Sequence, residues 1–177
     1  KSLPMAETPI GHVTNGIHVP SYVGSWMNEL LRQYLGSGWM QAPPGAGVWD
    51  KVDQIPDEAY WAARMHQKEA LLDELRRRIP EFIQKYHLPS DERRRMESML
   101  KPDTLIIGFA RRFAPYKRAT LIFADPDRLA KILNNSTRPV VLVFSGKAHP
   151  ADEAGINLIQ EVLRMCRDER FLGRIFF

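Results

Sequence analysis

The sequence predicts an α/β fold in which a parallel sheet follows a helical N-terminal segment. Two short, continuously apolar runs, TLIIGFA at 104–110 and PVVLVFSG at 139–146, are typical of strands that a parallel sheet buries on both faces. Helical patterns separate these runs from each other and from a third apolar run at 174–177. This order of strand, helices, strand, helix and strand indicates a Rossmann-like sheet with right-handed crossovers.

The N-terminal part of the chain is predicted to be loop and helix. Residues 9–21 carry proline, glycine and asparagine at short intervals, which is typical of a loop. Apolar residues at helical spacing predict a helix over 22–35 and a longer helical region from about Asp57. Pro80 is expected to kink or split that long helix, and Ser90 is expected to cap the helix that follows.

A change of pattern near residue 100 divides the chain in two. Residues 1–100 form the predicted loop and helical lead-in segment, and residues 101–177 form the first βαβαβ portion of a Rossmann-like domain. In this second part, helices are expected to begin at Pro115 and at the Asp125-Pro126 pair, because proline needs no amide partner at a first helical position. The chain stops at GRIFF, just as a strand forms, so we expect a fragment of a longer protein.

Charge and composition narrow the class of protein. The 177 residues carry a formal net charge of +4 with a pI near 9.3, which suits an anionic ligand or nucleic acid. No run approaches the roughly 18 to 20 apolar residues of a membrane span. The single cysteine, Cys166, is expected to be a buried, inert thiol, and a reducing cytoplasm is the expected location. The arginine runs at 76–78 and 93–95 have acidic neighbours and are interpreted as solvated helix faces.

Four other cations stand where two predicted strands end. Arg111 and Arg112 follow the first strand, and Lys147 follows the second. Lys117 falls in the expected first turn of the next helix. Ligands of open parallel sheets bind beside the carboxyl ends of the strands, where first-turn amides add partial positive charge. Arginine holds an oxyanion with two donors and lysine adds a point charge, so the sequence predicts a phosphate-binding site at this edge.

Other chemistries find little support in the sequence. Neither GxxxxGK[ST] nor GxGxxG follows a strand, which argues against a P-loop or a dinucleotide site. His12 and His18 lie in a loop without a cysteine or an acid at ligand spacing, so no metal site is predicted. A GxSxG nucleophile motif is absent.

Three motifs carry a resemblance to a known family. The stretches IGFARRFAPYKRATLIF at 107–123, VLVFSGKAHP at 141–150 and VTNGIHVPSY at 13–22 resemble the α-glucan (glycogen, starch and maltodextrin) phosphorylases. The likeness is greatest to the bacterial branch with short N-terminal regions. The motifs come in the family's order and spacing, and the likeness runs from about Pro9 to Phe177. The family's full enzymes are far longer, which agrees with a fragment.

The resemblance implies a GT-B architecture, in which two Rossmann-like domains enclose the active site and this chain begins the second domain. It implies an enzyme that transfers a terminal α-1,4-glucosyl unit of a glucan to inorganic phosphate and releases glucose 1-phosphate. It further implies pyridoxal phosphate as cofactor, held on a lysine beyond Phe177, and a glucan-binding domain before Lys1. The chain alone is therefore expected to have no phosphorylase activity and no covalent cofactor.

Five residues match functional positions of the family. Arg112 and Lys117 match the binders of the substrate phosphate, which gives them the catalytic role. Arg111 matches a cation close to the cofactor phosphate. Asn15 matches an asparagine that hydrogen-bonds the glucosyl unit, whereas Tyr22 stands where the family commonly carries a tryptophan next to the cofactor.

Two alternatives remain open at this point. A glycogen or starch synthase-type glycosyltransferase uses a sugar nucleotide and shares the fold and an Arg/Lys pair at the same edge. A non-enzymatic anion-binding module, such as a basic nucleic-acid binder, would need exposed cations interleaved with aromatic side chains. The expected partners are an α-1,4-glucan and inorganic phosphate, without nucleic acid or membrane, and the open edge of the sheet makes a homodimer an expectation.

Overall fold

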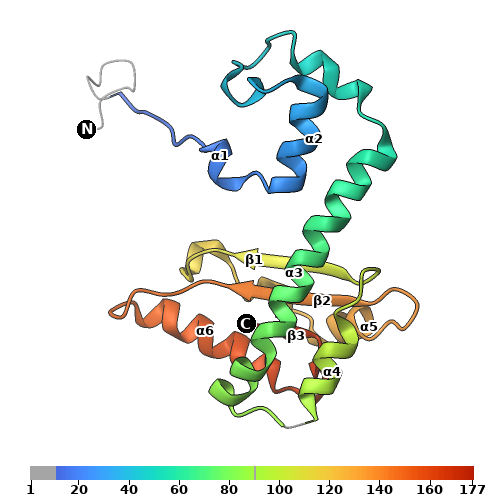
Figure 1. The fold of residues 1–177 in the computed structure, drawn as a ribbon. Coiled ribbons are helices and arrows are strands. Elements are labelled where there is room, and N and C mark those ends of the chain that lie inside the picture. Colours follow the sequence, from blue (N-terminus) through green and yellow to red (C-terminus); the bar gives the residue numbers. More distant parts are fainter. Residues whose placement is uncertain (1–10, 90) are drawn as a thin grey trace. The chain divides into compact units, whose positions relative to one another are not determined.

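A computed structural model describes residues 11–89 and 91–177, so the predicted cap at Ser90 and the first two residues of the predicted loop lie outside the described residues. The chain forms two compact units, Lys1–Gln67 and Lys68–Phe177 (Figure 1). This border differs from the predicted division near residue 100. The reason is that the second half of a long helix shares one core with the sheet and therefore belongs to the second unit.

The described part of the first unit consists of helices and turns. Helix α1 (Val19–Tyr22) and helix α2 (Ser25–Leu35) come first. Two 3₁₀ turns, η2 (Trp39–Gln41) and η3 (Trp49–Gln54), follow them. The long helix α3 (Asp57–Tyr86) then begins in this unit.

Helix α1 lies at the end of the stretch predicted as loop, so that prediction is wrong from Val19 onward. Pro20 fits the first turn of a helix because an amide there has no partner within the helix. The Val23 amide donates to the Val19 carbonyl at 3.0 Å, and His18 Nδ1 lies 2.8 Å from Ser21 Oγ. These contacts close a single helical turn where the sequence suggested irregular chain.

Helix α2 confirms the helix predicted over this stretch. It buries Leu30 and Leu35, and Gly36 ends it with a φ of 95°, a conformation that glycine adopts without strain. Trp39 follows directly, is 4% exposed, and packs edge-on against Trp49 with 6.2 Å between the ring centroids. The first unit therefore has a small apolar centre between α2 and the two turns.

Helix α3 continues through Pro80 without a break, so the predicted split is wrong (Figure 1). Proline in a helix interior costs about 3 kcal/mol. On the same half of the helix, Leu72, Ile79 and Phe82 are buried in the core. Each large buried apolar side chain contributes about 1.5–3 kcal/mol, so the three together outweigh the proline. Helix α4 (Glu92–Met99) follows.

The second unit is built on a parallel sheet, which confirms the predicted α/β class. Strands β1 (Leu105–Ala110), β2 (Val140–Ser145) and β3 (Ile175–Phe176) lie in the order β1-β2-β3. Helix α5 (Pro126–Leu133) lies between β1 and β2 in the chain, and α6 (Glu153–Cys166) lies between β2 and β3. The carboxyl ends of β1 and β2 consequently meet at one edge of the sheet.

Strand β1 is more exposed than predicted. Leu105 is 57% exposed and Ile107 is 41% exposed, whereas β2 and β3 are buried along most of their length. Among the described residues β1 pairs on one side only, with β2. The prediction that 104–110 is buried on both faces is therefore wrong in this structure, because the described elements leave the face of β1 that carries Leu105 and Ile107 open to solvent.

Two ionisable side chains are buried in the described part of the second unit. Cys166 is 3% exposed, and burial raises the pKa of its thiol to about 12, which agrees with the predicted buried, inert thiol. Glu92 is 2% exposed, and burial also raises the pKa of its carboxyl group. Glu92 Oε1 accepts a hydrogen bond from the Gly173 amide, which ties α4 to the segment before β3.

The two arginine runs lie on helix surfaces, as predicted. Five of the six guanidinium groups, all except that of Arg94, form ion pairs with acids three or four positions away in the chain. Exposed pairs of this kind contribute about 1 kcal/mol or less, and they leave little positive charge for a ligand. The pairs are Arg76–Asp73, Arg77–Glu74, Arg78–Glu74, Arg93–Glu97 and Arg95–Asp91.

Candidate anion-binding site

The segments that follow β1 and β2 are held side by side by main-chain hydrogen bonds. The Arg111 amide donates to the Ser145 carbonyl at 3.1 Å, and the Phe113 amide donates to the Lys147 carbonyl at 3.0 Å. These bonds continue the parallel ladder beyond the ends of both strands. The cations predicted at the sheet edge therefore stand on backbone whose position is fixed.

Two glycines allow these segments to approach closely. A Cβ at Gly146 would lie 2.0 Å from the Arg111 carbonyl oxygen, and a Cβ at Gly155 would lie 2.4 Å from the Phe113 carbonyl oxygen. Both distances are far shorter than a van der Waals contact, so a side chain does not fit at either position. The strand ends and the first turn of α6 therefore form one compact rim.

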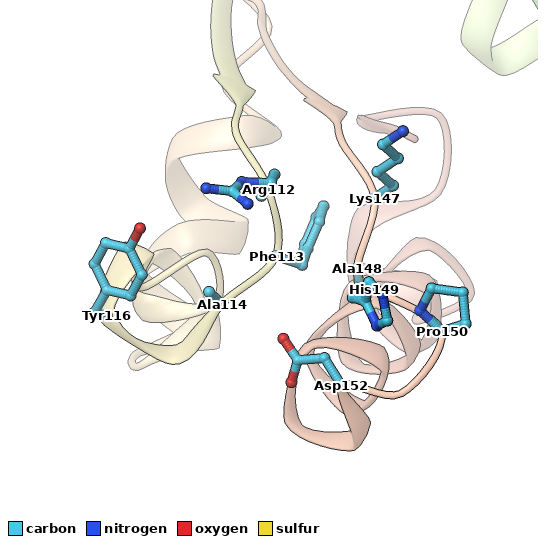
Figure 2. Close-up of a pocket in the computed structure, with 9 residues that line it drawn as sticks. All are labelled: Arg112, Phe113, Ala114, Tyr116, Lys147, Ala148, His149, Pro150 and Asp152. Carbon is cyan, nitrogen blue, oxygen red and sulfur yellow. The ribbon is translucent and has the colours of Figure 1, made fainter. Parts of the chain in front are cut away.

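A cavity of about 510 Å³ opens at this rim (Figure 2). Figure 2 shows Arg112 and Tyr116 on the side of the segment after β1, and His149 on the side of the loop between β2 and α6. Phe113 lies between Arg112 and Lys147, whose side chains extend in different directions. The cavity is lined by Arg112, Phe113, Ala114, Tyr116, Lys147, Ala148, His149, Pro150 and Asp152.

The cations at the rim have no acid partners within the described part of the chain. No hydrogen bond or ion pair there engages the side chain of Arg111, Arg112 or Lys147, in contrast to most of the helix arginines. Asp152 is the acid in the lining of this cavity, and its Oδ1 already accepts from the Gly155 amide at 2.9 Å. Unpaired cations at a concave surface are available to an oxyanion.

Lys117 is half-buried and lies next to the lining of this cavity. Its Nζ is 4.7 Å from the ring centroid of Tyr116, which does line the cavity, so a cation–π contact orients the ammonium group. The predicted α-helix start at Pro115 is wrong, since η4 (Pro115–Lys117) is a single 3₁₀ turn that ends at Arg118 with a φ of 55°. The partial positive charge expected from helix amides beside Lys117 is therefore missing, and the positive charge of the site comes from side chains.

The two remaining predicted site residues, Asn15 and Tyr22, belong to the first unit. Asn15 is exposed in the irregular stretch before α1. Tyr22 is the last residue of α1, and it is 80% exposed. Neither residue lines the cavity, so the substrate and cofactor roles predicted for them stay predictions.

The described residues offer neither a metal-binding group nor a membrane-spanning helix. Across residues 11–89 and 91–177, no three His, Cys, Asp or Glu side chains are grouped so that they could hold a metal ion. Within these same ranges, no helix combines the length and the apolar composition needed to cross a lipid bilayer.

Three polar residues of the cavity lining, Tyr116, His149 and Asp152, were not among the predicted site residues. A signal existed for His149, because the KAHP stretch directly follows the second predicted strand, where ligands of parallel sheets bind. Asp152 carried the signal of a helix cap, since it immediately precedes an amphipathic run. Tyr116 stands beside Lys117 in the RRFAPYKR motif.

Comparisons with known proteins give several relatives that carry phosphorylase names. No family model and no solved structure matches the chain. It is 39% identical over 171 residues to a glycogen phosphorylase of Aquifex aeolicus, and 39% identical over 176 residues to a maltodextrin phosphorylase of Thermococcus litoralis. It is 35% identical over 171 residues to a glycogen phosphorylase of Mycobacterium tuberculosis. These matches cover 97%, 98% and 97% of this chain, in that order.

The chain spans only 25%, 20% and 20% of the length of these three curated relatives. Identity at this level over nearly the whole chain confirms the resemblance that the three motifs indicated. The synthase alternative is not favoured, because all three relatives carry phosphorylase names. The chain is therefore homologous, over nearly its whole length, to one segment of the glycogen and maltodextrin phosphorylases.

Proposed function

We propose that the chain is the phosphate-binding segment of an α-glucan phosphorylase. The whole enzyme transfers a terminal α-1,4-glucosyl unit of a glucan to inorganic phosphate and forms glucose 1-phosphate. The observation that carries this proposal is the cavity at the carboxyl ends of β1 and β2, where Arg112 and Lys147 have no acid partner within the described residues. Homology to proteins named phosphorylases supports the same reaction.

Arg112 and Lys117 are proposed to hold the substrate phosphate. Arg112 offers two parallel donors from the cavity wall, and Lys117 adds a positive charge that Tyr116 orients. Positive charge develops on the glucosyl carbon as the glycosidic bond breaks, and a phosphate held beside it stabilises that charge before bonding to the carbon. The phosphate also gives a proton to the departing glucan oxygen, so the reaction needs no pair of protein carboxylates.

Pyridoxal phosphate is the proposed cofactor, and when bound it supplies a second phosphate group beside the substrate phosphate. Two phosphates side by side repel each other, so the protein must provide fixed cations around them. Arg111 fits this requirement, since it directly follows β1 and has no acid partner in the described residues. Tyr22 is proposed to lie near the cofactor and Asn15 to bind the glucosyl unit. The lysine that carries the cofactor is assigned to another segment of the enzyme.

The chain alone is expected to bind phosphate without catalysing glucan cleavage. Its three relatives are four to five times longer, so the glucan-binding region and the cofactor lysine are assigned to the remainder of the enzyme. A cytoplasmic location is part of the proposal, and the buried single thiol of Cys166 supports it. A homodimer is also proposed, and the exposed Leu105 and Ile107 on the edge strand β1 support it.

Replacing Arg112 by alanine is expected to weaken the binding of inorganic phosphate to the chain by about 10- to 100-fold. The reason is that hydrogen bonds to charged groups contribute about 1.5–3 kcal/mol. Isothermal titration calorimetry with inorganic phosphate measures the change. The matched control is Arg93→Ala, since Arg93 already pairs with Glu97 at 2.8 Å, and it should leave phosphate affinity unchanged. An equal loss of phosphate affinity in both variants, or no loss of affinity in either, would contradict the proposal.

A further inference from the structure

His149 lies in the wall of the cavity across from Arg112 (Figure 2). The amide of Ala151 donates a hydrogen bond to His149 Nδ1 at 3.1 Å. A ring nitrogen that accepts a hydrogen bond carries no proton, so the proton of the neutral imidazole is on Nε2. The loop between β2 and α6 therefore holds the ring so that the N–H group at Nε2 lies on the side of the ring away from the Ala151 amide.

This donor is available to a ligand. Within the described part of the chain, no hydrogen bond or ion pair occupies Nε2 of His149, and the side chain is exposed at the cavity. A phosphate held by Arg112 still has oxygens on its other side, because one guanidinium pairs with two oxygens at most. A donor in the facing wall supplies the hydrogen bond that these remaining oxygens require.

We propose that His149 contacts the bound phosphate and donates from Nε2 to one of its oxygens. This inference rests on the proposed function and adds to it a residue for which the family resemblance gives no role. Lys147, from the same loop, adds a positive charge to the same cavity. The segment after β1 and the loop after β2 thus each provide one half of the anion site.

Asp152 sets the charge balance of this site. Its carboxylate lines the same cavity and opposes an anion, although Oδ1 also caps α6 by accepting from the Gly155 amide at 2.9 Å. Arg112 and Lys147 provide two positive charges against this single negative charge, so the cavity stays positive even with His149 neutral. Asp152→Asn keeps the capping oxygen and removes the opposing charge, and it should therefore strengthen phosphate binding.

Two substitutions separate contact with phosphate from support of the loop. His149→Asn keeps a side-chain oxygen that accepts from the Ala151 amide, as asparagine does in turns, but it has no donor at the position of Nε2. His149→Ala removes both functions. If His149 contacts phosphate, both variants should bind inorganic phosphate about 3- to 10-fold more weakly than the wild-type chain, as expected for one lost hydrogen bond.

Calorimetric titrations with inorganic phosphate measure these affinities, and proton NMR of the imidazole signals observes the contact itself. The ring signal of His149 is identified by its loss in His149→Asn, and it should shift as phosphate is added. If His149→Ala binds phosphate more weakly but His149→Asn binds it as tightly as the wild-type chain, the ring only supports the loop. That result would overturn the inference.

The same titrations distinguish failure of this inference from failure of the proposed function. If Arg112→Ala abolishes phosphate binding while both His149 variants bind phosphate as tightly as the wild-type chain, only the inference about His149 is overturned. A wild-type chain that binds no phosphate overturns the proposed function, and the inference falls with it.

Discussion

Replacing Phe113 by alanine is expected to lower the free energy of unfolding of the chain by about 3–5 kcal/mol, the range for loss of a buried aromatic side chain. Phe113 is 1% exposed, and its ring centroid lies 5.5 Å from that of Phe109 and 5.6 Å from that of Phe177. Its amide also donates to Lys147, so the residue joins the core to the rim of the cavity. Its loss should leave a void directly beneath the anion site.

Urea unfolding followed by far-ultraviolet circular dichroism measures this effect. Tryptophan fluorescence is unsuitable, because the four tryptophans all lie in the first unit, whereas Phe113 lies in the second. The matched control is Tyr116→Ala, since Tyr116 is an aromatic residue of the same motif and is 71% exposed. The control should change the free energy of unfolding by less than about 1 kcal/mol. A loss below about 1 kcal/mol in Phe113→Ala, no larger than in the control, would show that Phe113 is not a core residue.

Replacing Gly146 by alanine is expected to destabilise the chain by about 1–3 kcal/mol and to reduce phosphate binding. The new Cβ would lie 2.0 Å from the carbonyl oxygen of Arg111. Both positions belong to the main chain, so no side-chain rotation relieves the overlap, and the segments after β1 and β2 must move apart. That movement stretches the hydrogen bond between Phe113 and Lys147 and displaces Arg112 from its place in the cavity wall.

Gly108→Ala is the matched control, because Gly108 lies within β1 and a Cβ there would be 4.0 Å from its nearest neighbour, the Val143 carbonyl oxygen. It should change the free energy of unfolding by less than about 1 kcal/mol. The change should be stabilising if the backbone at this position tolerates alanine. Calorimetry with phosphate and chemical unfolding on both variants give the comparison. Full stability and full phosphate affinity in Gly146→Ala would refute the close packing of the rim.

The strands and the cations at their ends could be predicted from the sequence because both depend on short segments of the chain. The apolar runs at 104–110 and 139–146 form β1 and β2 within one residue of the predicted ends. A parallel sheet aligns the carboxyl ends of its strands. Arg112 and Lys147, each placed just after a strand, therefore reach the lining of one cavity.

The features that the sequence did not predict depend on contacts between distant segments. The exposure of Leu105 and Ile107 depends on which elements lie over β1, and an apolar run alone does not contain that information. The continuity of α3 at Pro80 depends on the burial of its neighbours against the sheet. The orientation of His149 depends on a loop hydrogen bond from Ala151, which no periodic pattern marks.

Inorganic phosphate is proposed to bind at the carboxyl ends of β1 and β2. Mapping of amide chemical shifts during a phosphate titration of the chain tests this proposal most directly. We predict saturable shifts that are largest in the segments 111–117 and 146–152 and that disappear in Arg112→Ala. Shifts that are largest on the arginine-rich surfaces of α3 and α4, or the absence of any saturable shift, would contradict the claim.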